Sequence, residues 1–359
     1  MTSPALSELT TMKVGGPARL LISATTREEL IDAAEETWDS PEPWLVLGGG
    51  SNLVVADEGF DGTVIHVQTR GILRIPGTST IQVAAGESWD GTVAWAVENN
   101  LAGIEALSGI PGTVGAAPIQ NIGAYGQEVA SVITAVEFLD ATTREISRIP
   151  AEELGFGYRD SIFKQGRRGI VLTVEMELTE SAESMPIAFP QLATALKVEL
   201  GATVPLNHVR ETVWALRSSK GMVLDPSDPD TFSAGSFFMN PLVTENFARG
   251  LPADAPKYPV DAATEDRVLG LNADVPALAP PTLVKLSAAW LIEKAGIPKG
   301  FQLPGSGAAI SSKHTLAITN RDNASAADII GLAGYVQALV QSHFGVILHP
   351  EPLLVDLDL

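Results

Sequence analysis

Three polar residues in separate segments have the side-chain types needed for acid–base chemistry on an anionic substrate. Arg159, in GYRDSIFK, carries a planar guanidinium that can clamp a carboxylate through two parallel hydrogen bonds. Ser236, in SAGSFFMNP, places a hydroxyl between small and aromatic residues, where it can donate a proton if its alkoxide is stabilised. Glu351, in HPEP, lies between two prolines on a stiff backbone and can act as a general acid.

Each of these residues also has a simpler interpretation. Arg159 can pair with a neighbouring aspartate on the surface, which contributes little stability. Ser236 can belong to a turn at the end of a strand, and Glu351 can be an ordinary exposed glutamate. No histidine lies near Ser236 and no G-x-S-x-G motif is present, so a hydrolase triad is not indicated.

Two glycine-rich, uncharged segments are candidates for contact with a cofactor. One is LGGGSN (47–52), and the other is GIPGTVGAAPIQNIGAYG (109–126), with five glycines and two prolines. Such backbone can approach a ligand closely, and consecutive amides can bind an anion. LGGGSN is not a Rossmann fingerprint, because the LVVAD that follows it is typical of a strand. The two segments fit two sides of a flavin dinucleotide; the alternative is a pair of structural turns.

The elements that must position these segments follow from periodicity and capping. Thr26 and Glu29 form a capping-box pattern at the start of a helix. Strands are predicted at 18–24, 44–49, 53–57, 63–67, 80–85, 132–140, 169–178 and 314–320, and helices at 26–37, 88–99, 190–219 (in two pieces, broken near Pro205), 284–296 and 324–344. The proline-rich stretch 251–281 is predicted to be an irregular surface excursion. The pattern is α+β.

Composition narrows the class of protein. The chain has 359 residues, of which 45% are hydrophobic and 18% charged, enough for two or three domains with a substantial core. Cysteine is absent, which excludes disulfides and thiolate catalysis. The net charge of −20 disfavours nucleic acid and anionic membrane surfaces as partners, and the dense basic stretch Lys164, Arg167 and Arg168 is short. We expect a monomeric cytoplasmic protein without membrane insertion.

Taken in order across nearly the whole chain, the segments resemble the UDP-N-acetylenolpyruvoylglucosamine reductases, flavoenzymes of peptidoglycan precursor synthesis. The matching segments are LGGGSN, GIPGTVGAAPIQNIGAYG, YRDSIFK, GSFFMNP, KLSAAWLIEKAG and the PE near the end. The resemblance implies an α+β fold with the FAD-binding architecture of vanillyl-alcohol oxidase and p-cresol methylhydroxylase. It implies FAD-binding subdomains at 1–68 and 69–217, a substrate-binding domain at 218–335 and a C-terminal segment at 336–359 that carries the catalytic glutamate.

The resemblance also implies the reaction. NADPH reduces noncovalently bound FAD, and UDP-N-acetylglucosamine enolpyruvate is then reduced to UDP-N-acetylmuramate. Hydride passes from flavin N5 to C3 of the enolpyruvyl group, Ser236 gives a proton to C2, and Arg159 and Glu351 stabilise the enolate. Glu351 must hold a proton to help an anion, so we expect its pKa to be raised.

Site residues carried over from the resemblance fall into two sets, and no metal site is expected. Those expected at FAD are Leu47, Gly48, Gly49, Gly50, Ser51, Asn52, Ile110, Pro111, Gly112, Thr113, Val114, Gly115, Ala117, Asn121, Gly123 and Arg217. Those expected at the substrate are Tyr125, Tyr158, Phe189, Lys220, Asn240, Tyr258 and Gln302. Two positions depart from the family pattern. Phe189 stands where a tyrosine is common, and PEPLL replaces the usual Pro-Glu-Val-Arg ending.

Two other functions remain open. A noncovalent flavin oxidase or dehydrogenase of the same fold would use the same glycine-rich segments on another substrate. A catalytically silent nucleotide-binding module would keep the fold, but it would need none of Arg159, Ser236 and Glu351.

Overall fold

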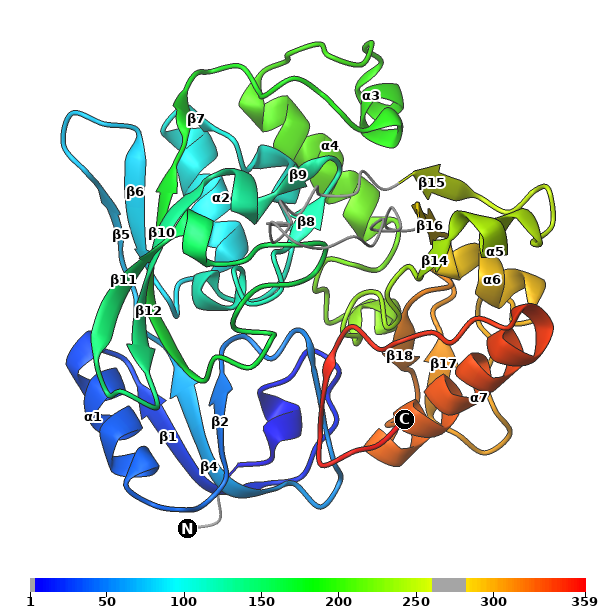
Figure 1. Cartoon of the computed structure of the whole chain (residues 1–359), viewed down its shortest axis with the longest axis horizontal. Coiled ribbons are helices and arrows are strands. Elements are labelled where there is room, and N and C mark those ends of the chain that lie inside the picture. Colours follow the sequence, from blue (N-terminus) through cyan, green and yellow to red (C-terminus); the bar gives the residue numbers. More distant parts are fainter. Residues whose placement is uncertain (1–3, 260–281) are drawn as a thin grey trace, which may run out of the picture.

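The computed structural model, which describes residues 4–259 and 282–359, divides most of its strands among three sheets (Figure 1). The first sheet is parallel, in the order β1-β4-β2, and α1 packs on it. These elements are β1 (Ala18–Ala24), α1 (Arg27–Trp38), β2 (Trp44–Leu47) and β4 (Phe60–Val67). The predicted capping box is present, because the Thr26 side chain accepts from Glu29 N and the Glu29 carboxylate accepts from Thr26 N.

The second sheet is antiparallel, in the order β11-β10-β12-β6-β5. Its strands are β5 (Ile72–Arg74), β6 (Thr80–Ala84), β10 (Ile133–Asp140), β11 (Ile146–Pro150) and β12 (Gly169–Glu177), and the helices nearby are α2 (Trp89–Glu98), α3 (Pro190–Leu196) and α4 (Leu206–Ser218). One hydrophobic core joins this sheet to the first, with Ile65 from β4 and Val136 from β10 both fully buried in it. The first two sheets therefore share one continuous hydrophobic core.

The third part follows α4 and has its own core around α7. It contains β14 (Leu242–Thr244), α5 (Glu245–Arg249), β15 (Lys257–Pro259), β16 (Leu283–Leu286), α6 (Ala288–Lys294), β17 (Ala308–Ile310), β18 (Ile318–Asn320) and α7 (Ala326–Phe344). Shorter pairs elsewhere are β7 (Leu101–Ala102) with β13 (Thr179–Glu180) and β8 (Gly123–Ala124) with β9 (Gln127–Glu128). No helix within the described part of the chain is both long and apolar enough to cross a membrane.

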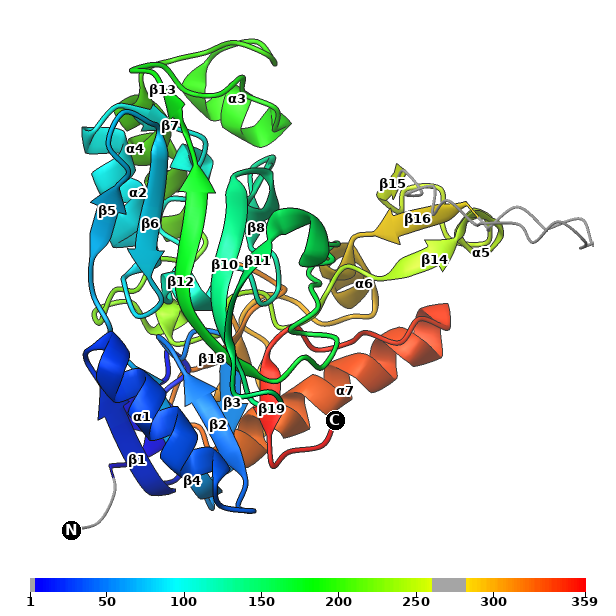
Figure 2. The ribbon, with the colours of Figure 1, turned by 60° about the vertical axis from the view of Figure 1, so that its left-hand side comes forward.

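The end of the chain returns to its beginning. Strand β19 (Leu353–Val355) pairs in parallel with β3 (Leu53–Val55), so the C-terminal segment becomes part of the N-terminal half (Figure 2). A second link lies at the start of α7, where the Asp57 carboxylate accepts from Ala326 N at 2.7 Å and from Ala327 N at 3.1 Å. The C-terminal part of the chain is thus joined to the N-terminal half both at the start of α7 and at β19.

The helices predicted at 26–37, 88–99 and 324–344 are confirmed within two residues at each end, and α3 and α4 are separated near Pro205 as expected. The helix predicted over 284–296 is wrong at its start, because β16 occupies its first residues and α6 begins only after the N-cap Ser287. The strand predicted over 314–320 shortens to β18, because a turn closed by Ala317 N on His314 O precedes it.

The predicted domain division stays a prediction, and α7 runs unbroken across its boundary at 335/336. Within the excursion predicted at 251–281, residues 257–259 form β15, and residues 260–281 lie outside the described residues.

The contact between Asp57 and α7 should contribute to the stability of the whole chain. A carboxylate at a helix N-terminus satisfies unpaired amides and meets the positive end of the helix dipole. We expect Asp57→Ala to lower the free energy of unfolding in urea by about 1 kcal/mol. Asp61→Ala is the control, because the Asp61 side chain is 92% exposed in its pair with Arg19. Equal losses in the two variants would contradict a special role for Asp57.

Candidate active site

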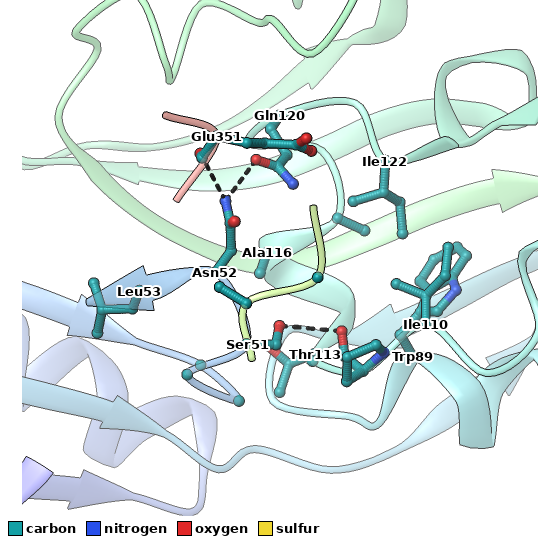
Figure 3. A pocket seen from close by; sticks show the side chains of 18 of the residues that line it. Ser51, Asn52, Leu53, Trp89, Ile110, Thr113, Ala116, Gln120, Ile122 and Glu351 are labelled. Atoms are coloured by element: carbon teal, nitrogen blue, oxygen red, sulfur yellow. Dashed lines mark hydrogen bonds between the residues drawn. The ribbon is translucent and has the colours of Figure 1, made fainter. Parts of the chain in front are cut away.

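The two glycine-rich segments line one cavity of about 340 Å³ (Figure 3). The residues of the predicted FAD set that line it are Leu47, Gly48, Gly49, Gly50, Ser51, Asn52, Ile110, Pro111, Gly112, Thr113, Ala117, Gly123 and Arg217, together with the predicted catalytic residues Arg159, Ser236 and Glu351. The structure therefore brings the three predicted catalytic residues to the same cavity as most of the predicted FAD contacts. Val114 is instead buried in the core, and Asn121 is buried behind the wall.

Contact between the two segments explains part of their glycine content. A Cβ atom added to Gly48 would lie 2.4 Å from Thr113 Oγ1, and one added to Gly49 would lie 2.8 Å from Gly112 Cα. Ser51 Oγ also donates to Pro111 O at 3.1 Å across the same junction. The bare backbone thus faces the other segment as well as the cavity, so the two interpretations made from the sequence, ligand contact and structural turn, both apply.

A second cavity of about 290 Å³ adjoins the first and shares Gly48, Thr113 and Ile119 with it. Gly115, predicted at FAD, lines this one. Its outer wall contains Trp44 and Arg168, whose guanidinium carbon lies 4.3 Å from the centre of the Trp44 ring. Arg168 was not among the predicted site residues, although it belongs to the short basic stretch noted in the sequence.

An ion pair between Arg159 and Glu351 lies at the cavity wall. Arg159 Nε donates to Glu351 Oε1 at 3.0 Å, and both side chains are less than one-fifth exposed. Arg159 also donates from Nη2 to Gly123 O at 2.8 Å and from Nη1 to Asn121 O at 3.3 Å. Burial raises the pKa of Glu351, against the opposing effect of Arg159 and Lys164. The direction agrees with the raised pKa expected from the sequence.

The backbone of Arg159 has φ +56°, a left-handed conformation that costs most residues on the order of 1 kcal/mol. It belongs to a tight turn closed by two hydrogen bonds between Gly157 and Asp160, from Gly157 N to Asp160 O and from Asp160 N to Gly157 O. The turn aims the guanidinium at Glu351, and such strain at a cavity wall is typical of a functional residue.

Ser236 reaches the cavity because its segment pairs with the segment of Glu351. Glu351 N donates to Phe237 O at 2.9 Å, and Met239 N donates to His349 O at 3.0 Å. The hydroxyl of Ser236 and the carboxyl of Glu351 therefore come from neighbouring extended segments that line the same space. This pairing was not readable from the sequence.

Arg217 brings a positive charge to the same cavity. Its Nη2 donates to Met222 O, whereas its Nε is shielded from solvent and has no acceptor within the described residues. No ion pair found within residues 4–259 and 282–359 includes this guanidinium. Burial lowers its pKa, against the opposing effect of Tyr125 and Asp90, and an anionic ligand would stabilise such a shielded cation further.

None of the seven predicted substrate residues is among the residues that line the two cavities, and all but Gln302 fall into two groups. In the first, Lys220 Nζ donates to Gln191 Oε1 at 3.0 Å and lies 5.5 Å from the centre of the Tyr125 ring, which meets Phe189 edge to face. Burial lowers the pKa of Lys220, and Arg217 adds to this.

In the second group, Lys285 Nζ lies 4.7 Å from the centre of the Tyr158 ring. Tyr258 is the cross-strand partner of Lys285, so the two side chains share a face of their sheet. Asn240 Oδ1 accepts from Ala288 N at the start of α6.

Gln302 is not brought to either group. Its carboxamide donates to Ser306 O and to Asp322 Oδ2, in the loop before β17 and beside the start of α7. Its role at the substrate stays a prediction that no contact of its side chain supports.

Comparison with known proteins shows the family. Residues 18–147 match the FAD binding domain model, and residues 226–355 match the model of the UDP-N-acetylenolpyruvoylglucosamine reductase C-terminal domain. The chain is 54% identical over 374 aligned positions to the UDP-N-acetylenolpyruvoylglucosamine reductase of Leifsonia xyli subsp. xyli, covering 99% of both chains. The chain belongs to the UDP-N-acetylenolpyruvoylglucosamine reductase family.

Other members of this reductase family agree over the same length. The Salinispora arenicola protein of that name is 46% identical over 98% of this chain and 94% of its own. The crystal structure of the Thermus caldophilus reductase matches with a TM-score of 0.64 at 28% identity, covering 98% of this chain and 97% of that one. The α+β fold, the FAD-binding domain and the place of this oxidoreductase in peptidoglycan precursor synthesis are therefore established.

The cavities of this reductase suit FAD by their own chemistry. The glycine-rich walls leave backbone exposed to a ligand, and Arg217 adds a positive charge to the lining that suits an anion. Two adjoining cavities match a cofactor with two flat ring systems joined by a charged linker. No cluster of three metal-ligating side chains was found among the described residues.

His314, in the turn before β18, gives the reductase a pH-dependent stability. Burial, together with Lys220 and Lys299, lowers its pKa to about 4, while Glu293 opposes the shift. In the unfolded chain His314 becomes protonated below about pH 6.5, whereas in the folded chain it stays neutral until about pH 4. The free energy of unfolding therefore falls as the pH drops from about 6.5 towards 4.

We expect His314→Asn to remove this contribution. The free energy of unfolding, measured in urea, should drop between pH 7 and pH 4.5 in both proteins. The drop should be about 2 kcal/mol smaller in the variant than in the parent. His343→Asn is the control, because His343 is exposed at the end of α7. Identical pH profiles for the parent and His314→Asn would contradict the assignment.

Proposed function

We propose that the chain reduces UDP-N-acetylglucosamine enolpyruvate to UDP-N-acetylmuramate with electrons from NADPH. The observation that carries this proposal is the convergence of Arg159, Ser236 and Glu351 on the cavity lined by the glycine-rich segments. A silent nucleotide-binding module would need no such convergence.

The residues present would hold FAD noncovalently across both cavities. Gly48–Asn52 and Ile110–Thr113 offer exposed backbone, and Arg217 offers the charge for an anionic part of the cofactor. Trp44 and Arg168 offer a flat, positively charged wall for the adenosine end in the second cavity. When bound, FAD would supply the hydride-transfer chemistry that links NADPH to the enolpyruvyl double bond.

Stabilisation of the enolate is the task of Arg159 and Glu351. Addition of hydride at C3 leaves negative charge on C2 and the adjacent carboxylate of the substrate. Arg159 is held by carbonyl groups on one side, so its charge is preorganised before that carboxylate arrives. Glu351, with its raised pKa, can carry the proton that lets it donate to the anion instead of repelling it.

Ser236 would supply the proton that completes the product at C2. A serine hydroxyl is a weak acid in water, but an enolate is a strong base. The segment pairing that fixes Ser236 beside Glu351 removes the entropic cost of bringing the donor to C2.

Lys220 would bind the pyrophosphate of the substrate, near Tyr125 and Phe189, and Asn240, Tyr158 and Tyr258 would lie along the remainder. Phe189 can stack on a nucleotide but offers no hydroxyl. The cytoplasmic location and the monomeric state stay predictions.

An anaerobic visible spectrum of the purified protein tests the proposal. The flavin band should bleach with NADPH and return when UDP-N-acetylglucosamine enolpyruvate is added. A band that returns only in air would indicate an oxidase or another acceptor. Absence of flavin after reconstitution with FAD would contradict the proposal.

Ser236→Ala should separate the two half-reactions. Reduction of the flavin by NADPH does not involve the hydroxyl, whereas reoxidation by the enolpyruvyl substrate should slow by about 10²- to 10⁴-fold. Ser131→Ala, which removes an exposed hydroxyl bonded to Glu128 O, is the matched control. If stopped-flow traces show equal losses in both half-reactions, Ser236 has only a structural role.

A further inference from the structure

We propose that Asn52 is a positioning residue that sets the geometry of the pair formed by Glu351 and Arg159. This inference rests on the proposed function, because it concerns the site in which those two side chains act. Asn52 was expected to contact FAD; it lines the cavity, and its side chain also donates hydrogen bonds to Gln120 and Glu351.

The contacts of Asn52 join three distant segments (Figure 3). Its Nδ2 donates to Gln120 Oε1 at 2.7 Å and to Glu351 O at 3.2 Å. Its own carbonyl accepts from Leu353 N at 3.0 Å, immediately before β3 and β19 pair. One residue thus links the first glycine-rich segment, the second one and the C-terminal segment.

The orientation of the Asn52 carboxamide follows from its partners. The backbone carbonyl of Glu351 can only accept a hydrogen bond, so the nitrogen of Asn52 must face it. The same nitrogen has a second hydrogen, and Gln120 Oε1 receives it. Both donors are used, which a leucine, serine or aspartate at this position could not reproduce.

Besides the bond from Asn52 Nδ2, the described residues give the backbone of Glu351 one hydrogen bond, while His349 O and Leu353 N hold the flanking positions. Its neighbours Pro350 and Pro352 have no N–H, and the N–H of Glu351 is already bound to Phe237 O. The hydrogen bond from Asn52 therefore fixes the carbonyl side of the residue whose carboxyl meets Arg159.

The contacts close a ring. From Asn52 it passes through the backbone and carboxyl of Glu351 to Arg159. Arg159 is held by the carbonyls of Asn121 and Gly123, which follow Gln120 in the chain, and Gln120 returns to Asn52. Both members of the ion pair are held by the hydrogen bonds of this ring. Loss of the bonds from Asn52 therefore allows Glu351 to move relative to Arg159.

Misplacement of a catalytic group by about 1 Å can cost on the order of 10²-fold in rate. A loosened pair also changes the titration of Glu351. Its carboxyl is surrounded by Arg159 and Lys164, which lower the pKa, and by the phenol of Tyr158. A weaker contact with Arg159 should therefore raise the pKa of Glu351 further. The rate of reoxidation falls at high pH as Glu351 loses its proton, and this fall, the alkaline limb of the pH profile, should move to higher pH.

Asn52→Leu in the full-length FAD-loaded enzyme tests the inference, because leucine has a similar shape without donors or charge. We expect reoxidation by the enolpyruvyl substrate to fall about tenfold more than flavin reduction by NADPH. We also expect the alkaline limb of reoxidation to shift upward by about one pH unit. Equal losses in both half-reactions with an unmoved limb would overturn the inference and leave Asn52 a structural residue.

Gln120→Leu opens the same ring from the other side and should shift the limb in the same direction by a smaller amount. It decides the question if Asn52→Leu fails to retain FAD, since an unmoved limb in Gln120→Leu then overturns the inference.

Glu351→Gln separates this inference from the proposed function. If Glu351→Gln slows reoxidation but neither ring variant moves the limb, only the role of Asn52 is wrong. If Glu351→Gln reoxidises at the parental rate, the role of Glu351 is wrong and the role of Asn52 is overturned with it.

Discussion

Burial of Glu351 against Arg159 is the interaction on which the site depends. Removing either charge from water is costly, and the mutual attraction of the pair repays this only where further hydrogen bonds complete the shell. Those bonds come from the carbonyls of Asn121 and Gly123, which the second glycine-rich segment carries. The glycines, the left-handed turn at Arg159 and the return of the chain end to β3 all support this one contact.

Two kinds of constraint meet in the glycine-rich segments. Each segment must pack against the other, as the contact of Gly48 with Thr113 shows, and each must leave backbone exposed on the opposite side. Replacing a glycine at this junction would affect the cavity indirectly, by forcing the walls apart. Tight packing between the walls is therefore also what fixes the width of the ligand site.

Local signals in the sequence predicted local structure well. The capping box at Thr26 and the apolar face of α7 depend on residues a few positions apart, so they can be read directly. The error at β16 arose because its residues continue the apolar pattern of α6, and only strand pairing with β14 and β15 decides their conformation.

The motifs identified the three catalytic candidates, but they gave no partners for them. Asn52 and Glu351 are 299 positions apart, and no periodicity reports such a contact. The wall formed by Trp44 and Arg168 was missed for the same reason.

The parallel pairing of β19 with β3 also determines the order in which the site is completed during synthesis. The residues around Asn52, Gln120 and Arg159 leave the ribosome long before Glu351, and N-terminal parts of a chain generally fold first. Strand β3 pairs with β19 in a sheet of two strands, and Glu351 and Leu353 line the cavity, so both the wall beside β3 and the acid are completed only after the C-terminal residues have been made. Full-length translation is in this sense the last step in assembling the active site.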